Sequence, residues 1–179
     1  MREVEIKVRL ASVKSFILKL DEKGIKLGEP KKQHDVVFSE PGAVENHFKA
    51  NWLRIRTEND SVVYFTLKKS VEGHLDNIEH EVTVNESAEL KNIILCLGYE
   101  PYSDLTKVRR KVKINDIEIC LDEVPGLGNF VEAEKLVDHD SDHDSVVSEL
   151  WQLLTSLGLS RENEVHEGYD VLERKNRGL

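Results

Sequence analysis

The chain has 179 residues, with 25 Lys and Arg against 34 Asp and Glu, so its formal net charge is −9. This length suffices for one domain with its own hydrophobic core, without disulfides or a structural metal. An acidic chain lacks the excess positive potential of a general nucleic-acid binder. We therefore expect a single domain over residues 1–179 and no nucleic-acid partner.

The two cysteines, Cys96 and Cys120, fall in apolar patterns and are too few for a disulfide framework. We interpret both as buried thiols in a reducing compartment. The first residues alternate in charge instead of forming the apolar stretch of a signal peptide, and no long apolar run follows. These features predict a cytoplasmic protein with no membrane partner.

Short alternating segments dominate the chain and predict β-strands, because successive side chains of a strand point to opposite faces. Asn59-Asp60 and Asn115-Asp116 join two pairs of segments, and these residue types tolerate the backbone angles of tight hairpins. Enough strands are present to close a sheet on itself. The eight predicted strands cover residues 2–10, 33–39, 51–58, 61–69, 78–85, 105–114, 117–124 and 130–137.

Helical periodicity interrupts the strands at three places. The first helix follows Ser12, a residue type that caps helices, and ends at Gly24. The second runs from Ser87 to Gly98, and the third covers residues 144–157. Each helix has an apolar stripe that can pack against a sheet. The stripes are Val13, Phe16, Ile17 and Leu20; Leu90, Ile93, Ile94 and Leu97; and Val146, Val147, Leu150, Trp151 and Leu154.

The predicted strands separate ionic side chains from apolar ones. A solvated face of an antiparallel sheet commonly has charges without any function. Here, however, acids gather on some strands and bases on others, and three helices must cover the apolar face. The ionic face is then the inside of a closed barrel. The ionic side chains on this face are Glu3, Glu5, Lys7, Arg9, Arg54, Arg56, Lys68, Glu79, Glu81, Lys107, Arg109, Lys111, Lys113, Asp122, Glu132 and Glu134.

Charges crowded inside a barrel predict a charged ligand, because buried like charges are costly unless they are compensated. An eight-stranded barrel has room for side chains or one small ligand. Carboxylates bind hard cations such as Mg²⁺ or Mn²⁺, and Arg and Lys bind phosphate oxygens. The sequence therefore predicts an α+β fold, a closed eight-stranded antiparallel β-barrel with helices packed on the outside, and a metal-bound polyphosphate inside it.

The first strand contains Glu3-Val4-Glu5-Ile6-Lys7, an ExExK pattern that also occurs by chance on charged strands. The whole ordered series of motifs is more specific, and it resembles the CYTH superfamily, the triphosphate tunnel metalloenzymes, over roughly residues 1–172. Within that superfamily the chain is most similar to the class IV adenylyl cyclases. The companion motifs are Leu53-Arg54-Ile55-Arg56, Thr66-Leu67-Lys68, Glu79-His80-Glu81, Lys107-Val108-Arg109-Arg110, Leu121-Asp122-Glu123-Val124 and the segment 126–134.

The resemblance implies a triphosphate tunnel with Mg²⁺ or Mn²⁺ as cofactor, ATP as substrate and a homodimeric assembly. One position departs from the family pattern, because Asn77 stands where many relatives have Arg. The resemblance also assigns roles. Glu3, Glu5, Asp122, Glu132 and Glu134 would hold metal, Glu79 and Glu81 would lie on the same acidic wall, and Lys7, Arg54, Arg56, Lys68, Lys107 and Arg109 would contact the triphosphate.

Three activities are compatible with these motifs. A cyclase would use the ribose 3′-hydroxyl to attack the α-phosphate in line, with pyrophosphate as leaving group. An inorganic or thiamine triphosphatase would direct water at the terminal phosphorus and release orthophosphate. A non-catalytic polyphosphate- or nucleotide-binding module would need only the bases, so the acids argue against it. We favour the cyclase on the resemblance.

Other motifs have structural interpretations. The acidic segment 138–149 has His143 where a Ca²⁺ loop requires glycine, so we interpret it as a solvated helix N-terminus. The segment 126–128 lacks the spacing of a phosphate loop and predicts a strand connection. We assign no element to the polar segment after Arg161, and expect Tyr169 and Leu172 to dock it.

Overall fold

The computed structural model describes residues 1–43, 50–70 and 77–179. Within these residues one antiparallel sheet has the strand order β5-β4-β3-β2-β6-β7-β8-β1-β9, with a further pairing of β5 with β1. The predicted fold class, α+β with a closed eight-stranded antiparallel barrel and helices outside, is confirmed, with β9 as an extra strand. Whether residues 1–179 are a single domain stays a prediction.

The chain divides into two compact units, Met1–Pro30 with Val108–His166 and Lys31–Lys107 with Glu167–Leu179. None of the helices in the described part of the chain has the length and apolar content needed to cross a bilayer.

The first unit takes the part of β6 (Glu100–Ile114) from Val108 onward. Its other elements are β1 (Arg2–Leu10), α1 (Val13–Glu22), β7 (Ile117–Val124), β8 (Gly128–Val137), α3 (His143–Ser156), η1 (Arg161–Asn163) and β9 (Glu164–Val165).

Side-chain caps fix where the helices of the first unit begin. The hydroxyl of Ser12 accepts a hydrogen bond from the backbone N–H of Ser15 at 3.2 Å, as its residue type predicts. The carboxylate of Asp142 accepts one from the N–H of Ser145 at 3.0 Å. The acidic segment before α3 is therefore a helix N-terminus, as the sequence predicts.

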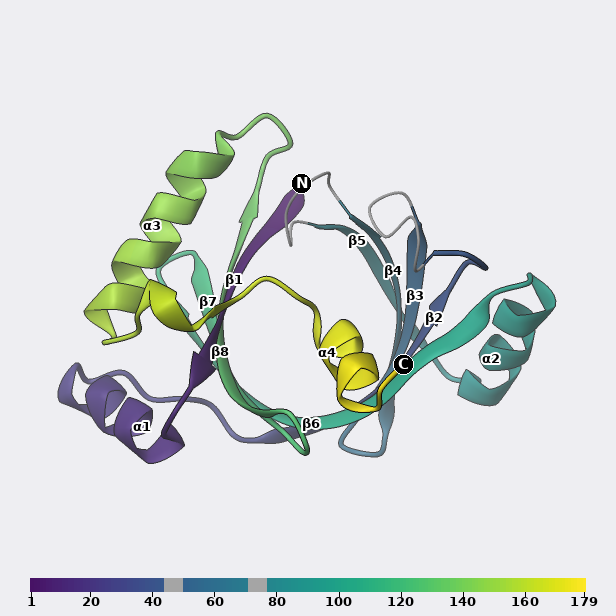
Figure 1. Cartoon of the computed structure of the whole chain (residues 1–179), viewed down its shortest axis with the longest axis horizontal. Helices are drawn as coiled ribbons and strands as arrows, with labels where there is room; N and C mark the ends of the chain where they lie inside the picture. Colours follow the sequence, from purple (N-terminus) through teal and green to yellow (C-terminus); the bar gives the residue numbers. More distant parts are fainter. Residues whose placement is uncertain (44–49, 71–76) are drawn as a thin grey trace. The chain divides into compact units, whose positions relative to one another are not determined.

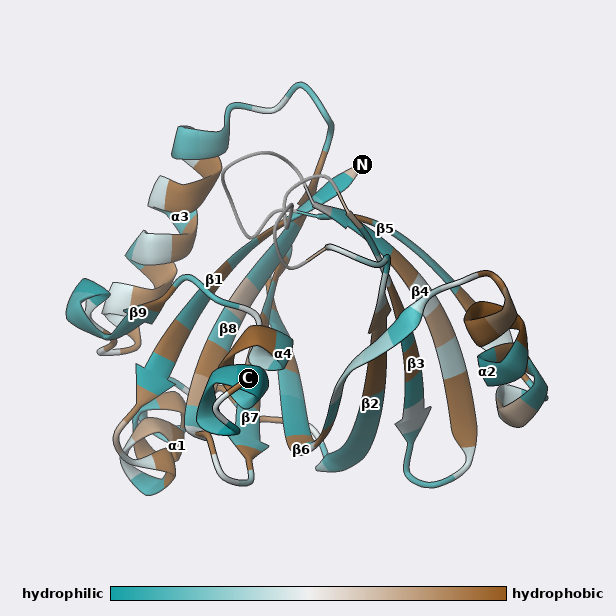
Figure 2. Cartoon of the chain, turned by 45° about the vertical axis from the view of Figure 1, so that its right-hand side comes forward, coloured by the Kyte–Doolittle hydropathy of each residue, from teal (hydrophilic) through white to brown (hydrophobic). Residues whose placement is uncertain are grey.

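The apolar face of the first unit is covered by helices. Val4 and Val8 of β1 are completely buried, together with Leu150 and Leu154 of α3. Figure 1 shows α1 and α3 alongside β1, and Figure 2 shows the alternation of polar and apolar residues along this strand. Burial of each such side chain stabilises the fold by about 1.5–3 kcal/mol. The predicted apolar face is thus the outer, helix-covered one.

The second unit is built on a meander of four strands. Its tight turn at Asn59-Asp60 has φ angles of 50° and 55°, which confirms the predicted hairpin. Phe38 of the sheet and Ile94 of the helix are almost completely buried in the same hydrophobic cluster. The helix α2 therefore packs on the outer face of the strands. The elements are β2 (Lys31–Ser39), β3 (Asn51–Glu58), β4 (Val62–Ser70), β5 (Asn77–Val84), α2 (Ser87–Cys96), the first half of β6 and α4 (Tyr169–Asn176).

Two predictions about α2 are wrong. Cys96 is exposed, not buried, and Ile93 and Leu97 are 50% and 70% exposed. Rotation explains Cys96 and Ile93, because successive helical residues turn by about 100°. With Ile94 facing the strands, Cys96 points about 200° away and Ile93 about 100° away. Leu97 is the C-cap, beyond the last residue of the helix. Cys120, in contrast, is buried as predicted.

The C-terminal segment adds an element that the sequence pattern did not predict. Its helix α4 is polar over most of its surface, and Tyr169 is its buried residue. The Nζ atom of Lys107 lies 4.7 Å from the centroid of the Tyr169 ring, a cation–π contact that docks the helix. The expected docking role of Tyr169 is confirmed.

Candidate active site

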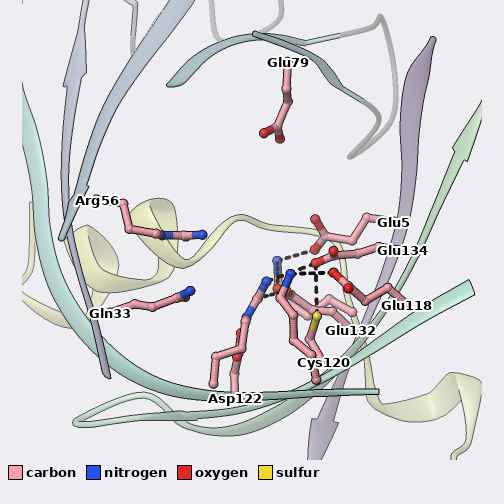
Figure 3. Close-up of polar contacts among 12 residues, drawn as sticks. Glu5, Gln33, Arg56, Glu79, Glu118, Cys120, Asp122, Glu132 and Glu134 are labelled. Carbon is pink, nitrogen blue, oxygen red and sulfur yellow. Dashed lines mark hydrogen bonds and ion pairs between the residues drawn. The ribbon is translucent and has the colours of Figure 1, made fainter. Parts of the chain in front are cut away.

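Three neighbouring strands of the first unit place acidic side chains in rows. The strand β8 lies between β1 and β7, and Glu134 is opposite both Glu5 and Glu118. In the adjacent row of the same face, Glu132 is opposite Lys7. Figure 3 shows these carboxylates gathered on one side of the sheet. Like charges directly opposite each other destabilise a sheet unless cations separate them, so this face requires positive charge.

The oxygens of these carboxylates lie close enough to share a cation. Glu5, Glu132 and Glu134 each offer one oxygen, and the three oxygens lie within 4.8 Å of one another. Oxygens on opposite sides of one Mg²⁺ are about 4.2 Å apart, because each lies about 2.1 Å from the ion. The spacing fits a hard divalent cation. A second group, Glu118, Cys120 and Glu134, meets the same distance limit.

Lys7 supplies one of the positive charges that these acids need. Its Nζ atom lies 3.0 Å from Glu5 Oε1 and 3.3 Å from Glu132 Oε1, and the residue is 2% exposed. Burial works to lower the pKa of Lys7, but the attraction of Glu5 and Glu132 is stronger and holds that pKa above its ordinary value. Lys7 therefore stays protonated.

Arg109 is the second cation of this acidic cluster. Its Nε and Nη2 atoms donate to the two oxygens of Asp122 at 2.7 and 2.5 Å, and Nη1 donates to Glu134 at 3.1 Å. Nη2 also donates to Glu132. Burial opposes the charge of Arg109, but the carboxylates, Asp122 first, raise its pKa well above its ordinary value. The geometry makes Arg109 a counter-ion of the acids, and its predicted contact with triphosphate stays a prediction.

Two further residues of β7 belong to the acidic cluster and have no assigned role in the sequence. Glu118 binds Lys111, and the thiol of Cys120 lies 3.6 Å from Glu134 Oε1. Burial raises the pKa of the Cys120 thiol far above its ordinary value, although Arg109 opposes this rise. A neutral, buried thiol is a poor nucleophile. Alternation along β7 is the sequence signal, since both residues share the face of Asp122.

In the second unit, two arginines lie on one face of β3. Arg56 of β3 lies opposite Asp35 of β2, and its Nε and Nη2 atoms donate to the two carboxylate oxygens at 2.7 and 2.6 Å. Asp35 is 5% exposed; burial acts to raise its pKa, but Arg56 lowers that pKa strongly. Asp35 has no role assigned from the sequence, although an acid directly before the apolar run Val36-Val37-Phe38 of a strand is a recognisable signal.

Arg54 lies in a different environment, on the same strand face as Arg56. Its Nη2 atom donates to the hydroxyl of Thr66 at 3.2 Å and lies 3.5 Å from Glu81 Oε2 and 3.9 Å from Glu79 Oε2. Burial, and then repulsion by Arg56, lowers the pKa of Arg54. Arginine keeps its charge through such a shift, and the predicted contact of Arg54 with triphosphate stays a prediction.

Lys68 and Glu79 pair directly across β4 and β5. Burial acts to raise the pKa of Glu79, but Lys68 and then Arg54 lower it, so Glu79 is a carboxylate at neutral pH. Glu81 has a side chain that is 43% exposed. Both acids of the predicted wall therefore contact predicted phosphate-binding bases of their own unit.

The remaining predicted residues lie on β6, β1 and β5. Lys107 is 2% exposed and contacts the ring of Tyr169. Glu3 lies on β1 opposite Leu136, and neither of the metal-binding groups found among the described residues includes it. Asn77 is the first residue of β5.

The fold and the paired acids and bases define the class of protein, a triphosphate tunnel fold. The model of the CYTH domain matches residues 1–169, so the chain belongs to the CYTH family. Members of this family are metal-dependent enzymes, either adenylyl cyclase-like or triphosphatases.

Known proteins resemble the chain along nearly its whole length. A protein of Methanocaldococcus jannaschii, named as a candidate adenylate cyclase, is 28% identical over 174 residues, which are 94% of this chain and 97% of that protein. A conserved hypothetical protein of Pyrococcus furiosus has a TM-score of 0.82 at 24% identity and covers 95% of this chain and 99% of its own. A candidate adenylyl cyclase from Hippeastrum, described as having a dominant triphosphatase activity, has a TM-score of 0.65 at 18% identity, over 99% of this chain and 96% of its own.

Proposed function

We propose that the chain is a metal-dependent adenylyl cyclase that converts ATP to cyclic AMP and pyrophosphate. The observation that carries the metal requirement is the convergence of Glu5, Glu132 and Glu134, whose oxygens lie within 4.8 Å of one another. The support for the cyclase reaction is the relative from Methanocaldococcus jannaschii that is named as a candidate adenylate cyclase. Family membership supports a triphosphate as the substrate.

The donor set fits Mg²⁺ or Mn²⁺, because hard cations prefer carboxylate oxygen and three such oxygens converge here. Glu5, Glu132 and Glu134 would hold the cation, with Glu3 of β1 and Asp122 of the adjacent strand β7 as further carboxylates. Bound there, the cation would supply Lewis acidity to the α-phosphate and lower the pKa of the attacking hydroxyl. Lys7 and Arg109 already neutralise this face, so the cation competes with them for the same oxygens.

The basic side chains would bind the phosphate chain and stabilise the leaving pyrophosphate. Arg54 and Lys68 lie with Glu79 on neighbouring strands of the second unit, and Lys107 is buried in the same unit. Their charges would offset the negative charge that develops on the oxygen between the α- and β-phosphates. Because these bases are fixed on strands, they need little reorganisation when that charge appears. The same bases would serve hydrolysis, so the nucleophile distinguishes the two reactions.

A triphosphatase is the second candidate, and the dominant triphosphatase activity described for the Hippeastrum structure favours it. The test is incubation with ATP, inorganic triphosphate or thiamine triphosphate, each with Mg²⁺ or Mn²⁺, followed by chromatography and phosphorus NMR. Cyclic AMP and pyrophosphate from ATP would support the cyclase. Orthophosphate without cyclic AMP would refute the cyclase and support hydrolysis.

The matched controls separate loss of metal from loss of folding. Glu132→Gln should abolish turnover, whereas Glu123→Gln, at an exposed position of the same sheet, should leave it unchanged. A chain that binds triphosphate without divalent metal and releases no product would be a binding module instead. The cytoplasmic location and the homodimer stay predictions.

A further inference from the structure

Arg54 and Arg56 are two residues apart on the same face of β3, yet their hydrogen bonds differ. The Nε and Nη2 atoms of Arg56 both donate to Asp35, so this side of its guanidinium is occupied by a buried carboxylate. Arg54 donates from Nη2 to the neutral hydroxyl of Thr66. Within residues 1–43, 50–70 and 77–179, its buried Nε atom donates to no acceptor. Arg54 is therefore held in place without being neutralised by a direct hydrogen bond to a carboxylate.

The position of Thr66 in the sheet explains why its hydroxyl binds Arg54. The register puts Arg54, Thr66 and Glu81 in one row across β3, β4 and β5. The Thr66 hydroxyl has one proton, which it donates to Glu81 Oε2 at 2.8 Å, and its oxygen accepts from Arg54 Nη2. Thr66 is completely buried, so its hydroxyl is held by these two bonds. The hydroxyl bridges a base and an acid that are only 3.5 Å apart.

We infer that Thr66 is a positioning residue that keeps Arg54 available for the phosphate chain, because its hydroxyl takes up the donor of Arg54 and the acceptor of Glu81 that would otherwise bind each other. This inference rests on the proposed function, since it names the residue that prepares one of its phosphate-binding groups. Without the hydroxyl, Glu81 lacks its donor and Arg54 lacks its acceptor. The two charged groups, already 3.5 Å apart, then form a direct charge-assisted hydrogen bond, which the phosphate chain must break.

The inference predicts a specific kinetic result. Thr66→Val removes the hydroxyl and keeps the shape of the side chain, and it should raise KM for ATP and for inorganic triphosphate about tenfold, the factor expected for one lost hydrogen bond to a charged group. The value of kcat should stay within about twofold, because bound substrate has already separated Arg54 from Glu81, so the cost of that separation falls on binding. Thr66→Ser keeps the hydroxyl and should stay near wild type.

Two further variants test the mechanism. Thr83 lies on the same face of β5 as Glu81 and is exposed, so Thr83→Val is the matched control and should change neither KM nor kcat. Adding Glu81→Gln to Thr66→Val removes the charge that captures Arg54, so KM should fall back toward the wild-type value. A double variant with the same KM as Thr66→Val would overturn the capture mechanism.

Other outcomes also decide the question. An unchanged KM in Thr66→Val overturns the positioning role, as does a Thr66→Ser variant that is impaired equally, since packing of the methyl group would then explain the loss. Denaturant unfolding of each variant shows whether KM reports on the site or on folding. If wild type turns over no triphosphate, the proposed function fails, and calorimetric binding of inorganic triphosphate with Mn²⁺ then tests Thr66 alone, with the same order of affinities expected.

Discussion

Replacing Arg109 with Met removes the central cation of the acidic cluster and keeps most of the volume of the side chain. Arg109 donates to Asp122, Glu132 and Glu134, and the side chains of these three carboxylates are 0%, 4% and 11% exposed. In the variant, buried negative charges face one another with Lys7 as their main counter-ion. We expect a large loss of stability and, unusually, a gain in affinity for divalent metal.

The magnitude follows from the burial of the partners. Removing one member of a buried ion pair costs about 3–5 kcal/mol, because the charge left behind is uncompensated. For a chain of this size, each kcal/mol corresponds to about 2–4 °C in Tm, so we expect Tm to fall by about 10 °C. A divalent cation restores the missing positive charge. At ten times its Kd, ligand binding stabilises the folded state by about 1.4 kcal/mol, and more as Kd falls.

The assay combines denaturant unfolding with calorimetric titration of Mn²⁺. In Arg109→Met, the free energy of unfolding should drop in EDTA and recover in part with Mn²⁺, and Kd for Mn²⁺ should be lower than in wild type. Arg177→Met is the control, because Arg177 is exposed and pairs with Glu173 on one turn of α4, where the expected change is below about 0.5 kcal/mol. A loss of under 1 kcal/mol in Arg109→Met, or an unchanged Kd for Mn²⁺, would refute the role of Arg109 as counter-ion.

The buried pair of Asp35 and Arg56 predicts an acid-sensitive contribution to stability. Because folding lowers the pKa of Asp35, its contribution is present above the unfolded pKa of about 3.9 and is lost as pH falls below it. Asp35→Asn should cost about 3 kcal/mol at pH 7 and flatten the dependence of unfolding free energy on pH between about 4 and 2. The two thiols should differ as well: an alkylating reagent should modify Cys96 and spare Cys120 in the native protein, as mass spectrometry of the peptides would show.

Controls for these two predictions use exposed or unfolded counterparts. Asp60→Asn, at a side chain that is 75% exposed, should leave both stability and its pH dependence unchanged. A pH profile of Asp35→Asn that is as steep as that of wild type would show that other carboxylates produce the acid dependence. Cys120 should react once the chain is unfolded in denaturant, and equal rates for both thiols in the native state would contradict the burial of Cys120.

Alternation in the sequence determined the strands and the side of each strand on which the charges lie. The predicted bounds 2–10, 51–58 and 117–124 are those of β1, β3 and β7. These bounds were readable because a period of two residues is a local property, set by the geometry of an extended backbone. The strand β6 begins earlier than the predicted residue 105, since Pro101 removes a donor and disguises the start of a strand.

Helical stripes were less reliable than strand alternation. The stripe of α1 is right in Phe16 and Leu20, which are buried. The stripe of α2 is wrong in Ile93 and Leu97, because only the tertiary packing decides which part of an apolar helix touches the sheet. The helix α4 is mostly polar, and its described contacts with Lys107 and Tyr102 involve residues that are distant in sequence.

The sequence determined which acids and bases share the ionic face, but not which of them pair. Side-chain partners across strands depend on register, and register is a property of the folded sheet. Because of the register, Arg56 binds the carboxylate of Asp35, whereas Arg54 binds the hydroxyl of Thr66. The two arginines lie on the same face of one strand and have the same predicted role. Register also placed Arg109 among the acids that the sequence assigns to metal. The strand face of each charged residue therefore follows from the local sequence, whereas its hydrogen-bond partners depend on the tertiary structure.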